Sequence, residues 1–209
     1  SSLQMGYKWS TVILGHVSGN IKSHDMNQDG FLDEPMMLQY NLANRWLYQA
    51  DNGVQVRFGV RAIQDNRKGG QLKSIKNPWE TNILNRSLNG YLKVGVPLNE
   101  DNSQNIALVA DYSYQNMDSF FGPTDYLAGQ HSAFANLLYQ NVISDSHRFT
   151  LGLNGTFDSY NEDFRRMVAV GRVEYNGITN LANTGIFGEY TFSSGDKFTA
   201  IAGLRGDWF

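Results

Sequence analysis

An acidic segment between residues 23 and 35 carries residue types that bind a metal ion. It reads SHDMNQDGFLDEP. In calcium loops, oxygen ligands stand at positions one, three, five, seven and nine, and a glycine at position six allows the sharp turn. The matching ligands are Asp25, Asn27, Asp29 and Asp33, with the backbone carbonyl of Phe31 at position seven. Three nearby carboxylates repel one another unless a cation lies between them. The segment therefore predicts a calcium site.

The segment departs from the EF-hand pattern at position twelve, where Met36 replaces a bidentate glutamate. Five protein ligands are fewer than the six to eight oxygens that calcium prefers, so water, Glu34 or another loop must complete the shell. We therefore expect a weak site, with a Kd of about 10⁻⁴ to 10⁻³ M, that orders the loop. Magnesium fits less well because it demands octahedral geometry. The alternative is a solvated turn, since Asn and Asp favour turns.

Catalytic arrangements are not apparent in this sequence. The four histidines show no HExxH or HxH spacing, there is no Gly-x-Ser-x-Gly elbow, and the chain has no cysteine. The net charge of −3 and the absence of a basic stripe argue against nucleic-acid binding. We therefore expect neither an enzyme nor a nucleic-acid-binding protein.

Exposed aromatic residues are expected in two further connections. They are Trp79, Phe120, Phe121 and Tyr126. Aromatics among Asn, Ser and Gly are typical of a ligand-contacting surface. Packing within the loops, or contact with lipopolysaccharide, is the alternative.

An alternation of apolar and polar residues indicates the strands that position these side chains. From Met36 to Ala50 one set of alternate residues is almost wholly apolar and the other mostly polar, which predicts a strand with one apolar face. The turn Asp51-Asn52-Gly53 then leads into a second such strand, as in a hairpin. The layout recurs along the chain and predicts nine strands of roughly 10 to 16 residues.

The expected connections alternate in length. Short turns are predicted near residues 51–53, 98–104, 143–147 and 193–196, and long loops near 18–35, 67–80, 117–128 and 160–181. Short turns at one rim and long loops at the other are typical of outer-membrane barrels. The odd strand number predicts a piece of a larger barrel, because bacterial single-chain barrels use even numbers.

The two predicted faces suit a bilayer and a wet interior. On one apolar face, Phe149 and Phe157 would lie about 20 Å apart along the membrane normal, as aromatic girdles do. Leu42, Val56, Leu108 and Leu153 are expected to face lipid. The opposite face carries charges that would be costly in an apolar core. They are Arg45, Arg57, Arg61, Asp111, Arg148, Asp158, Glu189, Arg205 and Asp207.

The predicted fold is therefore all-β, a transmembrane antiparallel up-and-down β-barrel, with residues 1–209 forming part of one barrel domain. The alternative is a large soluble β-sandwich or barrel with scattered surface aromatics.

Two parts of the sequence resemble the barrel of TonB-dependent outer-membrane receptors. They are the acidic segment followed by Asn44-Arg45-Trp46, and the run KFTAIAGLRGD from Lys197 to Asp207. The resemblance implies a 22-stranded barrel around an N-terminal plug, with energy supplied through a TonB box. Neither plug nor TonB box is found in these residues. It also implies an outer-membrane, multi-pass location and active uptake of a scarce nutrient.

The resemblance implies that the protein contacts membrane lipid, the cargo, and the TonB complex through the missing N-terminal region. A surface lipoprotein is a further partner to consider. Calcium-binding acidic loops occur in the cobalamin receptors of this family, so cobalamin is the first cargo to test. An outer-membrane hydrolase and a passive porin remain the alternatives.

Overall fold

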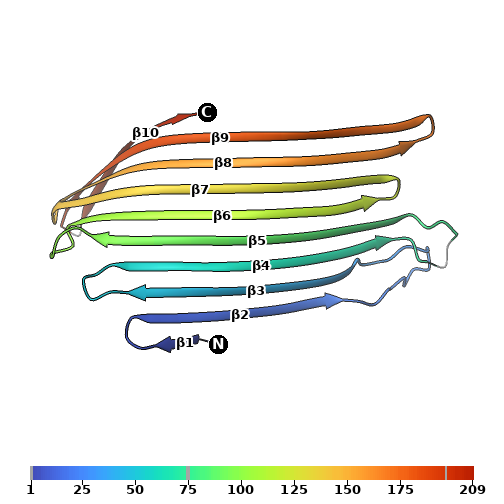
Figure 1. Ribbon diagram of the computed structural model, residues 1–209, viewed down its shortest axis with the longest axis horizontal. Helices are drawn as coiled ribbons and strands as arrows, with labels where there is room; N and C mark the ends of the chain where they lie inside the picture. Colours follow the sequence, from blue (N-terminus) through green and yellow to red (C-terminus); the bar gives the residue numbers. More distant parts are fainter. Residues whose placement is uncertain (1, 74–75, 196) are drawn as a thin grey trace.

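The computed structural model describes residues 2–73, 76–195 and 197–209, which form one antiparallel sheet. Its strands follow one another in chain order, so each pairs only with its neighbours in sequence (Figure 1). The strands are β1 (Ser2–Met5), β2 (Trp9–Asn20), β3 (Met36–Gln49), β4 (Gln55–Gly70), β5 (Glu80–Pro97), β6 (Gln104–Phe121), β7 (Thr124–Ser144), β8 (His147–Val168), β9 (Gly171–Ser194) and β10 (Phe198–Trp208). The predicted all-β, up-and-down fold is confirmed. The described part of the chain holds the nine predicted strands and one further short strand, β1.

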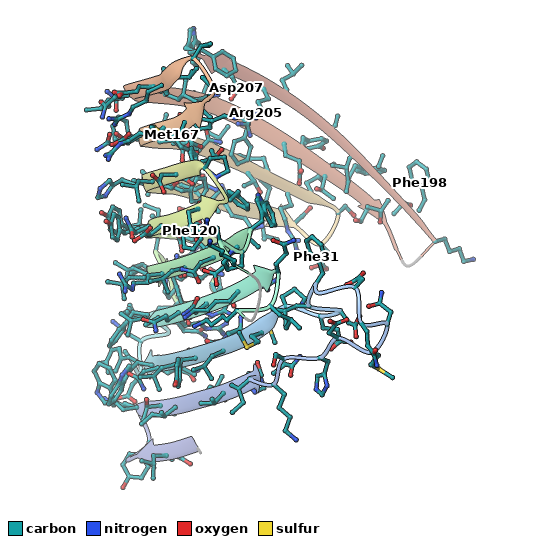
Figure 2. The ribbon with its side chains drawn as sticks, turned by 90° about the vertical axis from the view of Figure 1, so that its right-hand side faces the viewer. Phe31, Phe120, Met167, Phe198, Arg205 and Asp207 are labelled. Atoms are coloured by element: carbon teal, nitrogen blue, oxygen red, sulfur yellow. The ribbon has the colours of Figure 1, made fainter. Side chains whose placement is uncertain are left out.

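The sheet is open, because β1 and β10 each pair on one side only. Strands β7 to β10 sweep away from the plane of the others in Figure 2, so the sheet is strongly curved. No helix in the described residues is long and apolar enough to cross a membrane.

Cross-strand register aligns the apolar residues of successive strands on one face. Residues opposite each other in a pleated sheet lie on the same face. One such row crosses the sheet from β3 to β10 as Tyr48, Val56, Val94, Leu108, Leu137, Leu153, Ile186 and Gly206. The sequence prediction of a single apolar face is therefore confirmed across the sheet. We call it the apolar face and the other the polar face.

The apolar face has no protein layer against it. Ala43 is the only buried apolar side chain in the described structure, whereas Leu42, Leu153 and Leu204 are 58%, 55% and 86% exposed. The accessible surface is 14392 Å² for a chain of 23.5 kDa. A compact monomer of that mass exposes about 9,800 Å². The sheet on its own therefore lacks a hydrophobic core.

Two of the four predicted long loops are wrong. Strands β6 and β7 are joined by Gly122 and Pro123 alone, and β8 and β9 by Ala169 and Val170 alone. The strands continue through the segments predicted as loops, and β9 reaches 24 residues, beyond the expected 10 to 16. The physical reason is that the hydrogen bonds between neighbouring strands join backbone N–H and C=O groups, and they form whether or not the side chains make an apolar face. The end of the apolar pattern therefore does not end the strand.

The other two long connections are confirmed as residues 21–35 and 71–79. They lie at the same end of the sheet as the β6–β7 and β8–β9 turns, on the right in Figure 1. The opposite end carries the short turns, including Asp51-Asn52-Gly53, where Gly53 has a φ of 82°. We call these the long-connection end and the short-turn end.

Candidate functional site

The acidic segment forms a compact loop held by its own side chains. Asp25 accepts hydrogen bonds from the backbone N–H groups of Asp29 (3.1 Å) and Gly30 (3.0 Å). Asp29 accepts one from the N–H of Phe31 at 2.8 Å, and Asn27 donates to Asp29 at 3.0 Å. Gly30 has a φ of 84°, which a glycine adopts without strain. The turn expected at position six is therefore present.

Asp33, the fourth candidate side-chain ligand, closes the loop. Asp33 accepts a hydrogen bond from the N–H of Met26 at 2.7 Å, and its own N–H donates to the carbonyl of His24 at 2.9 Å. The structure thus joins Asp25, Asn27, Asp29 and Asp33 in one hydrogen-bonded loop.

The side-chain oxygens of this loop are of the kind that calcium binds, but they point toward backbone N–H groups rather than toward a common centre. Within the described ranges no three His, Asp or Glu side chains converge closely enough to hold a metal ion. Each carboxylate oxygen has two lone pairs, so one hydrogen bond leaves a second site for a cation. Calcium binding would require these carboxylates to turn toward one another, and the calcium site stays a prediction.

The acidic loop is bound to the next long connection by a backbone bridge between Phe31 and Gln71. The N–H of Leu32 donates to the carbonyl of Gly70 at 2.9 Å, and the N–H of Leu72 donates to the carbonyl of Gly30 at 2.8 Å. Neither hydrogen bond uses the carbonyl of Phe31, which is the expected calcium ligand at position seven.

The second connection is in turn held against the β6–β7 turn. Gln71 and Trp79 exchange two hydrogen bonds, one from the Gln71 N–H to the Trp79 carbonyl at 2.7 Å and one from the Trp79 N–H to Gln71 Oε1 at 2.8 Å. The N–H of Gly122 donates to the carbonyl of Glu80 at 2.8 Å. A side chain at Gly122 would meet the Trp79 indole, with Nε1 2.2 Å from an added Cβ. The two long connections and this turn therefore form one continuous contact network.

The aromatic residues predicted as one ligand surface are divided by the register. Trp79 lies in the connection beside Gly122, whereas Phe120, Phe121 and Tyr126 lie on strands and not in a loop, contrary to the prediction. Phe120 continues the apolar face, and Phe121 and Tyr126 lie on the polar face. A strand places neighbouring residues on opposite faces, so Phe120 and Phe121 cannot contact one ligand together.

Tyr126 belongs to an aromatic row that the sequence reasoning missed. Tyr126, Phe164 and Tyr175 are direct register partners across β7, β8 and β9 on the polar face. The Tyr126 hydroxyl donates to Glu162 at 2.6 Å, and this hydrogen bond to a carboxylate raises the pKa of the tyrosine. The alternation that would have revealed the row was present within the segments interpreted as loops.

A hollow of about 260 Å³ lies beside this row. Amide, carboxylate and phenol groups line it together with Met117. Gln130 donates to the Tyr160 hydroxyl at 3.2 Å within it. The remaining polar lining residues are Gln115, Tyr126 and Glu162. This mixture of aromatic surface and hydrogen-bonding groups suits a polar small molecule.

Histidines on the apolar face are paired with tyrosines. His131 Nδ1 lies 2.7 Å from the hydroxyl of Tyr112, and His147 Nδ1 lies 2.5 Å from that of Tyr190. These pairs hold no serine or acidic partner of the kind that a hydrolase uses. They are amphipathic rings, with His147 at the start of β8 beside a short turn and His131 within β7.

No protein-family model matches this sequence, and no curated protein matches it.

Proposed function

We propose that the chain is part of a transmembrane β-barrel of the bacterial outer membrane that takes up a scarce nutrient by TonB-dependent transport. The observation that carries this proposal is the continuous apolar face without a protein layer. A sheet of this kind needs either a second protein layer or a bilayer, and antiparallel strands can cross a bilayer when their polar groups are paired.

The stagger of the aromatic residues supports a membrane location. Tyr48 on β3 and Phe198 on β10 both stand beside short turns, yet the register row through Tyr48 meets β10 at Gly206, eight positions from Phe198. Eight residues are about 26 Å, and the seven strand spacings between β3 and β10 are about 34 Å. The strands would then tilt by about 38° from the normal of a plane through these two aromatics. Outer-membrane barrels tilt by about 35–45°.

The charged polar face supports a water-filled or plugged interior. Arg57 and Lys93 are register partners on that face, and neither has an ion-pair partner among the described residues. Such charges are costly against an apolar core and are accommodated in a wide barrel.

The proposed cargo is cobalamin, and its support is the acidic loop together with the resemblance it carries. Calcium, if bound there, would order the loop and, through the Gly30–Leu72 hydrogen bond, the connection beside Trp79. The polar-face row of Tyr126, Phe164 and Tyr175 would then contact cargo at the same end of the sheet. Phe120 is assigned no part in this contact because it lies on the apolar face.

The proposal is tested in a strain lacking the gene and any second cobalamin receptor. We expect growth on scarce cobalamin to fail and to return with the full-length gene. Uptake of radiolabelled cobalamin should stop when the inner-membrane potential is collapsed. Uptake that survives this collapse would indicate a passive porin, and normal growth of the deletion strain would exclude cobalamin as cargo. A hydrolytic activity lost with the gene would favour an outer-membrane hydrolase.

A further inference from the structure

Two hollows lie on the apolar face toward its long-connection end, between β3 and β6. We call the hollow farther from the long connections the lower hollow and the one beside them the upper hollow. The lower hollow, of about 340 Å³, is lined mainly by apolar and aromatic side chains, with Arg86 at its edge. Those apolar and aromatic residues are Tyr40, Leu42, Ala62, Ile63, Leu88 and Tyr114. The upper hollow, of about 460 Å³, is lined by Met36, Leu72 and Phe120 together with Lys68 and Lys73. Figure 2 looks onto this end of the sheet and labels Phe120.

The two hollows follow one another along the same face. Gln64 pairs with Arg86 at the edge of the lower hollow, and Lys68 pairs with Asn82 in the upper one. Gln64 and Lys68 are four residues apart, or about 13 Å along the strand. A ligand with an apolar tail and a polar head of this length can occupy both.

The cations at this surface have no ion-pair partner in the described residues. Lys68, Lys73 and Arg86 are exposed, and none is within an ion-pair distance of a carboxylate. Three carboxylates share the region. Glu80 lines the upper hollow, and Asp118 and Asp125 lie opposite Leu84 and Phe120 on the same face. The cations do not outnumber the acids, but none of the three cations is engaged in an ion pair in the described residues, so each is free to meet an anion.

The upper hollow also contains an unsatisfied acceptor. The side-chain oxygen of Asn82 is buried and has no hydrogen-bond partner in the described structure. Buried polar atoms are normally paired, and this oxygen needs a donor, such as a headgroup hydroxyl, rather than a phosphate oxygen.

We propose that this surface binds an anionic membrane lipid, with its phosphate beside Arg86 and Lys68 and an acyl chain along Leu42 and Leu88. Lys and Arg form charge-assisted hydrogen bonds with phosphate oxygens, and basic groups at a membrane boundary attract anionic headgroups. A soluble phosphate would not use the apolar lower hollow. The proposal rests on the membrane location proposed above.

The same two strands provide a matched control. Arg57 and Lys93 also lie on β4 and β5 but point to the polar face, where a bilayer lipid cannot reach them. Replacing them removes the same charge as replacing Lys68 and Arg86.

The experiment uses the full-length protein in nanodiscs of phosphatidylcholine with or without phosphatidylglycerol, followed by native mass spectrometry of the lipid retained. We expect the wild type to retain phosphatidylglycerol in preference to phosphatidylcholine. The Lys68→Gln/Arg86→Gln variant should retain about tenfold less, and Arg57→Gln/Lys93→Gln as much as the wild type. The conservative pair Lys68→Arg/Arg86→Lys should restore retention.

Three results would overturn the proposal. They are no preference for phosphatidylglycerol in the wild type, equal loss in the polar-face control, and displacement of the lipid by inorganic phosphate, which would indicate a soluble-anion site. Failure of the protein to enter nanodiscs would instead contradict the membrane location. The wild-type comparison decides the matter even if a variant does not fold.

Discussion

The backbone N–H of Leu72 donates a hydrogen bond to the carbonyl of Gly30 at 2.8 Å, across the space between two long connections. Gly30 is the turn residue of the acidic loop, and Leu72 is the second residue of the connection that ends at Trp79. A change of conformation at the acidic side chains therefore has a direct route, through one peptide group, to the neighbouring connection.

Calcium is expected to act through this route. Asp25→Ala and Asp29→Ala should each abolish the heat of calcium binding, because each removes a carboxylate from an already incomplete shell. Isothermal titration calorimetry of the full-length protein measures this, with Asp145→Ala in a turn at the short-turn end as the control. In hydrogen exchange, the Leu72 N–H should be better protected with calcium than with chelator. Unchanged heats in both loop variants would mean that the loop is only a turn.

The apolar face should reject charge in its middle. Leu153 lies four residues from both Phe149 and Phe157, so Leu153→Arg should lower the free energy of unfolding by about 2–4 kcal/mol in a bilayer. Asn154→Arg, one residue away on the polar face, should cost much less. Denaturant unfolding in lipid vesicles provides the comparison. Equal costs at the two positions would argue for a soluble sheet.

The contact between Trp79 and Gly122 should make Gly122 intolerant of a side chain. Gly122→Ala combines a φ of 56° with an overlap with the indole, and we expect a loss of about 1–3 kcal/mol. Gly195→Ala has the same φ of 56° but nothing within 4 Å of its new Cβ, so it measures the backbone cost alone. Adding Trp79→Ala to Gly122→Ala should recover the difference. If Gly122→Ala costs no more than Gly195→Ala, the contact has no energetic weight.

The Tyr126–Glu162 hydrogen bond gives a pH dependence at high pH. Its raised pKa means that the folded state favours the neutral phenol. The stabilisation is therefore complete below the ordinary tyrosine pKa, about 10, and is lost as the pH rises through the folded-state value. NMR of ¹³C-labelled tyrosines, assigned with Tyr126→Phe, should show the pKa of Tyr126 falling in Glu162→Gln. No change in that variant would exclude the hydrogen bond as its cause.

The sequence pattern predicted the middle of each strand better than its ends. In β8 the alternation of Phe149, Leu151 and Leu153 with polar residues was sufficient to predict the strand and its faces. Beyond Phe157 both faces become mainly polar, as in Asn161 and Glu162, and no apolar period remains to indicate a strand. Cross-strand pairing with β7 and β9 maintains β8 to Val168, and pairing is a property of three segments together.

The candidate site shows the same division between local and long-range information. The turn at Gly30 follows from residues within the acidic loop, and it was predicted from them. The assignment of Phe120 and Phe121 to opposite faces depends on β6 extending to Phe121, and the row of Tyr126, Phe164 and Tyr175 depends on the register of three strands. Neither can be obtained from spacing along one segment.

The sequential order of the strands has a consequence for how such a chain is assembled and how it diversifies. Because each strand pairs only with the strands before and after it, every long-range contact is made within one hairpin or between adjacent hairpins. Closing each hairpin costs little chain entropy, so the sheet can grow one strand pair at a time. A gene encoding this order can also gain or lose a hairpin by duplication or deletion without disturbing the pairing of the strands that remain.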